Sequence, residues 1–346
     1  MADVQTPRPV EAPRDPLARA ATMFVWVCIW LGCWGVIAGG VLLTVSRAFD
    51  VTRAIRVLIG QGVTPFVYFA VWPVAALAAW RRRWILTGVS LALMAVHIAV
   101  TLPAVWPHGA PGWAAKAPHL RVLVANVKAD NPTQVQAARL LGAQDVDAIV
   151  LVEITDAWVG ALQNAGVEAS FPYHVSQPDS FSARGAAVYA RVPVEAGPVI
   201  DLDRGRKEPS AVFTLDGGTK VTIFAIHLVS PYARSREERW RDNFTRLVDA
   251  VPTVRGPFVF AGDFNATRWH PFFGKLLDAG LTDAHERNGK GLTRSWPADR
   301  PHGVPPVMRL DHALMSAGVA ATAVRDLSIP GSDHRGFIVD LAVKPG

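Results

Sequence analysis

The stretch FVFAGDFN, from Phe258 to Asn265, decides the fold of this 346-residue chain. Its apolar, aromatic-rich run predicts a buried strand, and the run stops abruptly at Asp263 and Asn265. A second stretch, GSDHRGF at 331–337, places polar residues directly before the last apolar run. Strand ends in α/β folds bring side chains from rigid elements to a shared cleft, so both stretches predict such a cleft.

Polar residues end most of the other apolar runs as well. The run VLVAN ends at Asn126, IVLVE at Glu153 and IFAIH at His227, and RLDH carries Asp311 and His312. Taken alone, an Asn or Asp after a strand commonly caps a turn, and a Glu there is commonly solvated. Six endings that all carry carboxylate, amide or imidazole groups are hard to attribute to coincidence, and together they favour one shared site.

The wider pattern predicts a single α/β domain over residues 119–346, because short β-branched runs alternate with helical patterns. The predicted strands are 120–127, 147–152, 186–191, 209–215, 220–227, 257–262, 309–315 and 336–343. The predicted helices are 132–143, 155–165, 234–250 and 269–278, the first opened by Asn131 with Pro132 at its first position.

Three long segments without charge precede this domain. They lie between Arg19 and Arg47, between Arg56 and Arg81, and between Arg83 and Lys116. Each is at least as long as the roughly 20 residues that cross a hydrocarbon core, and buried helices of soluble proteins are usually shorter and amphipathic. The sequence therefore predicts a cytoplasmic arm at 1–21, transmembrane helices at about 22–45, 57–80 and 84–106, and a Pro/Gly/Ala linker at 107–118.

The net charge of +6 resembles that of a nucleic-acid-binding protein, but its distribution argues against that class. Residues 1–120 hold ten Lys or Arg and four Asp or Glu, whereas residues 121–346 hold 25 of each. The predicted soluble domain therefore lacks the overall positive field that attracts a polyanion. Nucleic acid is not the expected partner, and the sequence identifies no protein partner.

The same basic residues predict the orientation of the spans. Placing the N-terminal arm and the Arg81–Arg83 turn in the cytoplasm puts six arginines inside, which the positive-inside rule favours over the opposite arrangement. Three spans then place everything after residue 106 outside the cell. We therefore expect a multi-pass protein of the plasma membrane with an extracytoplasmic domain.

The strand-end residues suit a hard cation, because carboxylate and amide oxygens are the ligands that Mg²⁺ or Mn²⁺ prefers. The two cysteines, Cys28 and Cys33, both lie in the first apolar segment, so the domain has no thiolate ligands. A His beside an Asp provides an oriented imidazole, and a further Asp can activate a water molecule. The sequence contains no Walker loop, no GxSxG and no HExxH motif.

These motifs resemble the endonuclease/exonuclease/phosphatase superfamily, which includes DNase I-like nucleases, inositol-phosphate phosphatases and neutral sphingomyelinases. The resemblance runs from about residue 120 to 343. It rests on GDFN at 262–265 and SDHR at 332–335, with HL at 227–228 before the first of these motifs and LDH at 310–312 between the two. It implies a four-layer α/β/β/α sandwich and the divalent-metal-dependent hydrolysis of a phosphate ester or anhydride.

The resemblance also implies a role for each matching residue. Asn126, Glu153 and Asp333 correspond to the metal site, with Glu153 as the principal carboxylate. The catalytic positions are His227 against the scissile phosphate, Asp263 for the water molecule, Asn265 for the transition state, and His334 with Asp311 as its orienting carboxylate. The stretches at 171–174, 184–191 and 293–297 also match the superfamily and are expected to be structural or to shape the substrate site.

The substrate is open among several readings. A lipid-linked phosphate, such as a polyprenyl diphosphate, fits the membrane helices and the neutral domain. The overall layout is similar to the VanJ-type teicoplanin-resistance membrane proteins, which implies a role in the cell envelope and in glycopeptide resistance. The alternatives are a membrane-tethered extracytoplasmic nuclease, a sphingomyelinase-like phosphodiesterase and a binding module without activity, the last disfavoured because every catalytic position is intact.

Overall fold

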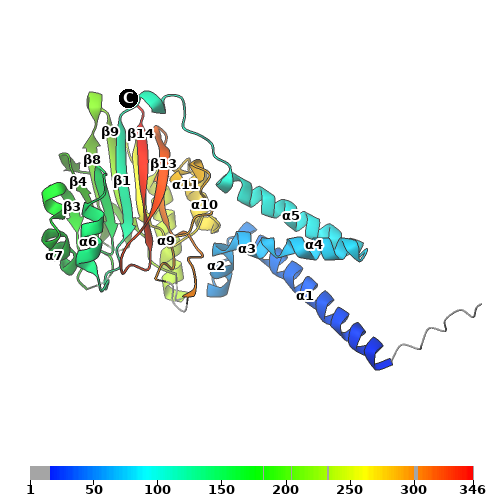
Figure 1. Ribbon diagram of the computed structural model, residues 1–346. Coiled ribbons are helices and arrows are strands. Elements are labelled where there is room, and N and C mark those ends of the chain that lie inside the picture. Colours follow the sequence, from blue (N-terminus) through cyan, green and yellow to red (C-terminus); the bar gives the residue numbers. More distant parts are fainter. Residues whose placement is uncertain (1–15, 182, 204, 232–233, 300–302, 346) are drawn as a thin grey trace, which may run out of the picture.

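The computed structural model describes residues 16–181, 183–203, 205–231, 234–299 and 303–345. After residue 118 the chain forms two six-stranded sheets that face one another (Figure 1). The first has the order β13-β14-β1-β2-β4-β3 and the second β11-β12-β10-β9-β8-β5, with β6 and β7 forming a separate pair. The strands of the first sheet are β1 His119–Asn126, β2 Ala148–Val152, β3 Tyr173–Gln177, β4 Ala186–Ala190, β13 Val319–Ser328 and β14 Arg335–Val343.

The second sheet is built from the middle of the chain. Its strands are β5 Val194–Ala196, β8 Ser210–Thr214, β9 Lys220–His227, β10 Phe258–Asp263, β11 Thr282–Asp283 and β12 Asp311–Met315, and the separate pair is β6 Ile200–Asp203 and β7 Arg206–Glu208. The helices around the two sheets are α6 Gln134–Gly142, α7 Asp156–Asn164, α8 Val167–Ser170, α9 Arg234–Ala250, α10 Pro271–Asp278 and α11 Ala284–Arg287, with short 3₁₀ turns η1 Ala114–Lys116 and η2 Asp216–Gly218.

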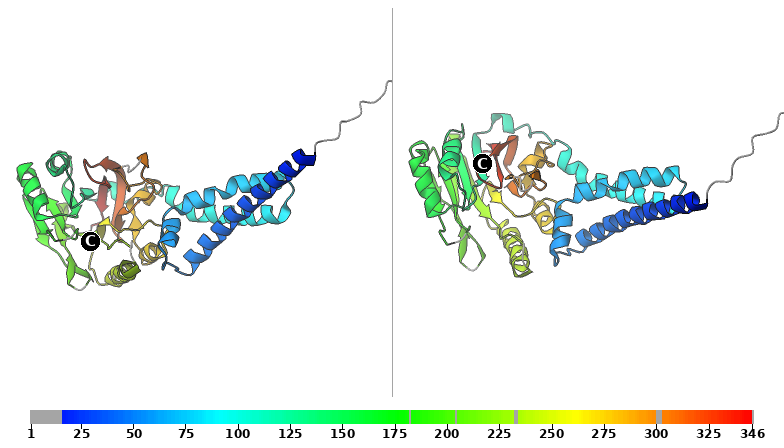
Figure 2. Two further views of the ribbon diagram at one scale, coloured as in Figure 1. Left: turned by 90° about the horizontal axis from the view of Figure 1, so that it is seen from below. Right: turned by 60° about the horizontal axis from the view of Figure 1, so that its bottom comes forward.

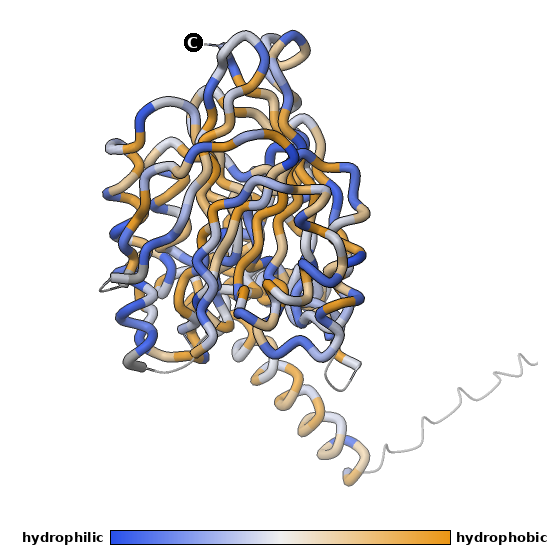
Figure 3. The backbone as a smooth tube through the Cα atoms, turned by 90° about the vertical axis from the view of Figure 1, so that its left-hand side faces the viewer, coloured by the Kyte–Doolittle hydropathy of each residue, from blue (hydrophilic) through white to orange (hydrophobic). Residues whose placement is uncertain are grey.

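Three apolar clusters hold these layers together, as the hydropathy colouring of Figure 3 shows for the central strands. One lies between the sheets and includes Val124 and Ile223. A second joins α6, α7 and α8 to the outer face of the first sheet around Trp158, and a third joins α9 and α10 to the second sheet around Trp240. The predicted four-layer α/β/β/α sandwich is confirmed.

All eight predicted strands and four predicted helices are present with small changes at their ends. The first predicted helix, 132–143, begins later than expected, because α6 starts at Gln134 after Thr133. The side chain of Asn131 accepts a hydrogen bond from the Thr133 amide at 2.7 Å in the turn before it. The strands that sequence reasoning missed are short or lie at an edge. The missed set is β3, β5, β6, β7, β11 and β13.

The N-terminal region forms helices, and among the described residues two are long and apolar enough to cross a membrane. These are α1 Pro16–Ala48 and α5 Trp84–Val105, close to the first and third predicted spans. The second predicted span, 57–80, is not a continuous helix. It is divided into α2 Ile55–Gly62, α3 Thr64–Phe69 and α4 Val71–Trp80, with a 75° bend between α2 and the rest, so the count of three spans is approximate.

The helices α1, α4 and α5 project together from one side of the two-sheet domain (Figures 1 and 2). The guanidinium of Arg81 lies 3.7 Å from the centre of the Trp26 ring, so the 81–83 turn packs beside the first half of α1. The turn and the beginning of α1 therefore share the end of the bundle that lies away from the domain. This is the arrangement that the predicted orientation requires, and the side of the membrane on which the domain lies stays a prediction.

The domain packs directly against the helical region rather than lying at the end of a long free linker. Leu58 of α2 is 3% exposed and belongs to the cluster around Trp240. The Nε2–H of His270 donates to the Leu58 carbonyl at 3.0 Å, since its Nδ1 already accepts from the Thr267 amide. Further hydrogen bonds join Arg47 to the Trp269 carbonyl, Arg268 to the Val100 carbonyl, and Gly291 to the Ala104 carbonyl.

The predicted linker is also partly packed. Ala114 in η1 and Ala117 are buried against Ala342 of β14, and the amide of His108 donates to the Arg287 carbonyl at 3.1 Å. The path from α5 to β1 is therefore attached to the domain at both of these points.

Replacing Leu58 with alanine should weaken this packing. Deleting a buried Leu side chain costs about 2–5 kcal/mol, so Leu58→Ala should lower the free energy of unfolding of the detergent-solubilised protein by that order. The neighbouring Ile59 is 49% exposed, and Ile59→Ala serves as the control that should unfold like the wild type. Equal stability of the two variants, measured by thermal or chemical unfolding, would show that α2 is not part of the core.

The buried histidine at this contact predicts a dependence of stability on pH. Burial lowers the pKa of His270 from 6.5 to about 4, so the folded protein holds a neutral ring where the unfolded chain is already protonated. Its contribution is fully present above pH 6.5 and is lost as the pH falls towards 4. Between pH 7.5 and pH 5, the melting temperature of His270→Gln should therefore fall less than that of the wild type, and an equal fall would contradict the assignment.

Candidate active site

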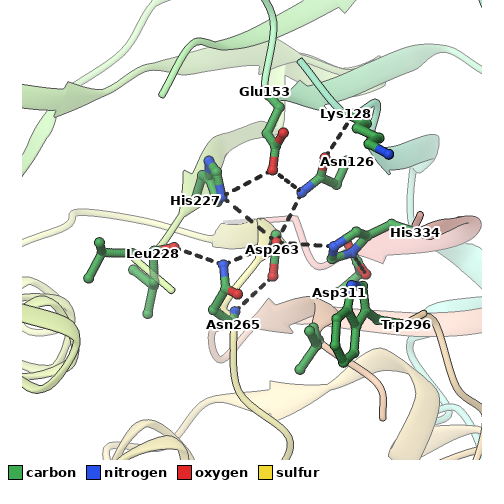
Figure 4. A network of polar contacts seen from close by, with 12 residues as sticks. Asn126, Lys128, Glu153, His227, Leu228, Asp263, Asn265, Trp296, Asp311 and His334 are labelled. Atoms are coloured by element: carbon green, nitrogen blue, oxygen red, sulfur yellow. Dashed lines mark hydrogen bonds and ion pairs between the residues drawn. The ribbon is translucent and has the colours of Figure 1, made fainter. Parts of the chain in front are cut away.

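The ends of strands from both sheets meet at one edge of the domain and bring six predicted residues together (Figure 4). The first sheet contributes Asn126 from the end of β1, Glu153 directly after β2, and His334 directly before β14. The second contributes His227 and Asp263 from the ends of β9 and β10, and Asp311 from the beginning of β12. Asp263 is paired in register with His227 on one side and Asp311 on the other, which fixes these three side chains in a row.

The backbone at this edge takes conformations that only particular residues favour. Gly262 has φ of 140°, and a Cβ built there would lie 2.1 Å from the Ile226 carbonyl oxygen, so the glycine of GDFN is required by the adjacent strand. Glu153 and Asn265 also have positive φ, 65° and 47° respectively. Such strain in residues other than glycine is common at functional sites, where the surrounding structure holds a side chain in one direction.

Asp263 is the centre of the hydrogen-bond network. Its side chain is buried and accepts from the Asn265 amide at 2.7 Å, from Asn265 Nδ2 at 3.2 Å and from Asn126 Nδ2 at 3.0 Å. Burial raises the pKa of the Asp263 carboxyl to about 7; the charge of His334 opposes this rise and that of Asp311 adds to it. The carboxyl is therefore placed to accept a proton near neutral pH.

Asn126 connects the two sheets. Besides Asp263, its Nδ2 donates to Glu153 Oε1 at 2.9 Å, and its own Oδ1 accepts from the Lys128 amide at 3.0 Å. The other oxygen of Glu153 accepts from the Ala129 amide at 3.0 Å. Asn126 therefore orients Glu153 with its nitrogen in this structure, while its role as a direct metal ligand stays a prediction.

His334 and Asp311 form a buried pair. The Nδ1–H of His334 donates to Asp311 Oδ2 at 2.8 Å, and the Nε2 lies 3.8 Å from Asp263 Oδ2. Burial disfavours the charged ring, but Asp311, Asp263 and Asp333 outweigh it and raise the pKa of His334 to about 10. The imidazole is therefore protonated at neutral pH, with Nε2–H directed towards the centre of the site.

Two groups of side chains have the donor atoms and spacing to hold a cation. Glu153, His227 and Asp263 form the first group, and Asp263, Asp311 and His334 form the second, with the donor atoms of each group within 4.8 Å of one another. His227 Nε2 lies 3.8 Å from both Glu153 Oε1 and Asp263 Oδ2. The first group fits a divalent ion better, because Glu153 lines the cavity, whereas in the second group His334 and Asp311 are hydrogen-bonded to each other.

Asp333, predicted as a metal ligand, lines the same cavity but belongs to neither group. Its Oδ2 accepts from Trp296 Nε1 at 3.3 Å, so Trp296 forms part of the wall beside His334 (Figure 4). Trp296 belongs to the 293–297 stretch, for which the sequence predicts a structural role or a role in shaping the substrate site.

The site opens into a cavity of about 360 Å³. Three arginines, Arg184, Arg236 and Arg239, contribute to its wall, and none of them is among the predicted catalytic or metal residues. Arg184 lies in the loop before β4, and the other two lie in the first turns of α9. In the sequence, Glu237, Glu238 and Asp242 interleave the arginines of 234–246, which favours a solvated helix and leaves open that one of these arginines binds a diphosphate. In the folded chain the three arginines add positive charge to the cavity that Glu153, Asp263 and Asp333 also line.

Comparison with known proteins agrees with this geometry. Residues 120–334 match the model of the Endonuclease/Exonuclease/phosphatase family. No curated protein sequence matches the chain. Solved structures with the same fold include an endonuclease/exonuclease/phosphatase from Beutenbergia cavernae, at 18% identity and a TM-score of 0.51, covering 66% of this chain and 72% of that one.

Two further structures are similar to the same extent. A humanized D. rerio TDP2 has 17% identity and a TM-score of 0.52 and covers 65% of this chain and 99% of that one. An endonuclease/exonuclease/phosphatase from Bacteroides vulgatus has 13% identity and a TM-score of 0.51, with 65% and 99% coverage. These likenesses concern the fold, whereas the family match spans most of the chain. The chain belongs to the endonuclease/exonuclease/phosphatase family, whose members are metal-dependent hydrolases of phosphoester bonds.

Proposed function

We propose that this protein hydrolyses a lipid-linked phosphate, such as a polyprenyl phosphate ester or diphosphate, at the outer face of the membrane. The observation that supports this substrate class above others is the direct packing of the hydrolase domain on the apolar helices through Leu58, Arg47 and Arg268. A domain attached in this way works at the membrane surface, where phosphates of lipids are concentrated and soluble polyanions are not.

The chain's own residues have separate tasks in this reaction. A divalent ion, which we propose to be Mg²⁺ or Mn²⁺ bound by Glu153, would neutralise the phosphate oxygens; Asn126 orients that carboxylate and Asp333 lines the same cavity. Asp263 accepts the proton of the attacking water, oriented by Asn126 and Asn265. His334, kept protonated by Asp311, donates Nε2–H to the charge that develops on the phosphate.

The three arginines of the cavity support a substrate with more than one phosphate or with a charged neighbour. Arg184, Arg236 and Arg239 line the same cavity as the catalytic residues. Guanidinium groups can bind phosphate oxygens with two parallel hydrogen bonds. We propose that they bind the phosphate that is not attacked.

The alternatives predict different partners. A nuclease needs a positive surface that tracks a polymer, and the balanced charge of residues 121–346 offers only the local arginines of the cavity. A sphingomyelinase-like phosphodiesterase shares the membrane location and differs in the bond cleaved. Removal of phosphate from a lipid carrier of cell-wall precursors is the step by which we propose a contribution to glycopeptide (teicoplanin) resistance.

Two substitutions test the site assignment. Asp263→Asn removes the proton acceptor and His334→Ala removes the protonated imidazole, so each should lower kcat/KM by about 10²–10⁴-fold while the protein still reaches the membrane. Asp278→Asn, at an exposed position of α10, is the matched control and should keep wild-type turnover. Retained turnover in either site variant, measured on membranes with equal amounts of protein, would contradict the assignment.

Phosphate release from undecaprenyl diphosphate and hydrolysis of DNA, compared with added Mg²⁺ and with EDTA, test the substrate and the metal together. We expect release from the lipid in the presence of Mg²⁺, loss of that activity with EDTA, and its recovery when Mg²⁺ is restored. Glu153→Gln should need a higher Mg²⁺ concentration for the same rate, because it removes the principal carboxylate ligand. Faster cleavage of DNA than of the lipid would favour the nuclease instead.

A further inference from the structure

The helical region contains an apolar groove of about 210 Å³ between α1, α2 and α3. Its wall is formed by Gly39, Leu42 and Leu43 of α1, Val57 and Gly60 of α2, and Val67 of α3. The groove lies where α2 turns by 75° from the direction of α3 and α4, so that α2 and α3 form two of its walls beside α1.

The opposite side of α2 is attached to the hydrolase domain. Leu58 enters the domain core, whereas Val57 and Gly60, on the other side of the helix, line the groove. Just before α2, the Thr52 hydroxyl donates to Glu237 in the first turn of α9. The same turn carries Arg236, and Arg239 follows one turn later, and both line the catalytic cavity. A short segment thus connects the groove to the catalytic cavity.

One charged residue completes the groove. Arg56, exposed in α2, contributes to a wall that is otherwise apolar apart from Ser46. An apolar channel with a guanidinium at its edge is complementary to a hydrocarbon chain that carries a phosphate head group. A larger apolar hollow of the helical region, around Trp30, Trp34 and Trp84, also has an arginine in its wall, Arg83. It lies at the end of the bundle away from the domain and therefore away from the catalytic cavity.

We propose that the groove between α1, α2 and α3 binds the hydrocarbon chain of the lipid phosphate whose head group enters the catalytic cavity. This inference rests on the proposed function and adds a site for the part of the substrate that is not hydrolysed. Chain binding in the groove holds the phosphate near the arginines of α9 and gives a long lipid a contact that a short compound lacks.

Filling the groove from a glycine tests this binding site. A Cβ added at Gly60 meets no atom within 4 Å, so Gly60→Leu projects into the groove without a backbone collision and replaces a poor helix former by a good one. We expect kcat/KM for undecaprenyl diphosphate to fall about tenfold, mainly through KM, because the new side chain takes up space in which the lipid chain packs. For geranyl diphosphate, a short and water-soluble compound with the same head group, kcat/KM should not change.

The matched control is Gly88→Leu, on a part of α5 that is exposed and that also offers open space to a Cβ. It should behave like the wild type with both compounds. Wild-type turnover of the long lipid by Gly60→Leu, or an equal fall with both compounds, would overturn the groove as the chain-binding site.

A second measurement separates this inference from the proposed function. A polyprenyl phosphate with a photoreactive group in its chain should crosslink to residues 39–67 of the wild type and much less to those of Gly60→Leu. Crosslinking outside this segment in the wild type would overturn the inference whether or not the lipid is hydrolysed. Absence of lipid hydrolysis by the wild type, with this crosslink present, would overturn only the proposed function.

Discussion

One buried carboxylate, that of Asp263, is the point on which the two halves of the site depend. It lies in register between His227 and Asp311 within the second sheet, and it reaches the first sheet through the Nδ2 of Asn126. Burying a charge of this kind is costly unless hydrogen bonds and an opposite charge accompany it. Asn265 and His334 provide these. The same contacts therefore join the two sheets at this edge and determine the chemistry of the site.

The sequence allowed the prediction of much of this arrangement, because polar residues at strand ends are a local signal. The eight strands that were predicted carry long β-branched or aromatic runs, whereas β5, β7 and β11 have three residues or fewer and contain charged side chains, so no period could identify them. The predicted residues lie close together once their strands are neighbours in the sheets, and the resemblance to the superfamily implies that arrangement of strands. The detailed roles required contacts: Asn126 presents its nitrogen to Glu153, and Asp333 lies with Trp296.

The attachment of the domain to the helices could not be predicted from local patterns. The 57–80 segment has no charge, and hydropathy alone does not distinguish a straight span from a helix that bends at Val63. The bend is explained by tertiary contacts, since Leu58 packs in the domain core and a Cβ at Gly62 would lie 2.9 Å from the Met308 side chain. Long-range packing of this kind overrides the preference of an apolar segment to continue in one direction.

The position of Leu58 inside the core of the neighbouring domain has a practical consequence for anyone who wishes to produce the hydrolase without its helices. A fragment that begins at the start of β1 would leave the aromatic surface around Trp240 uncovered and the ring nitrogen of His270 without the Leu58 carbonyl. Exposed apolar surface of this kind promotes association between molecules. A soluble version of the enzyme therefore needs a redesigned patch at this surface, with polar side chains in place of the apolar ones that α2 covers.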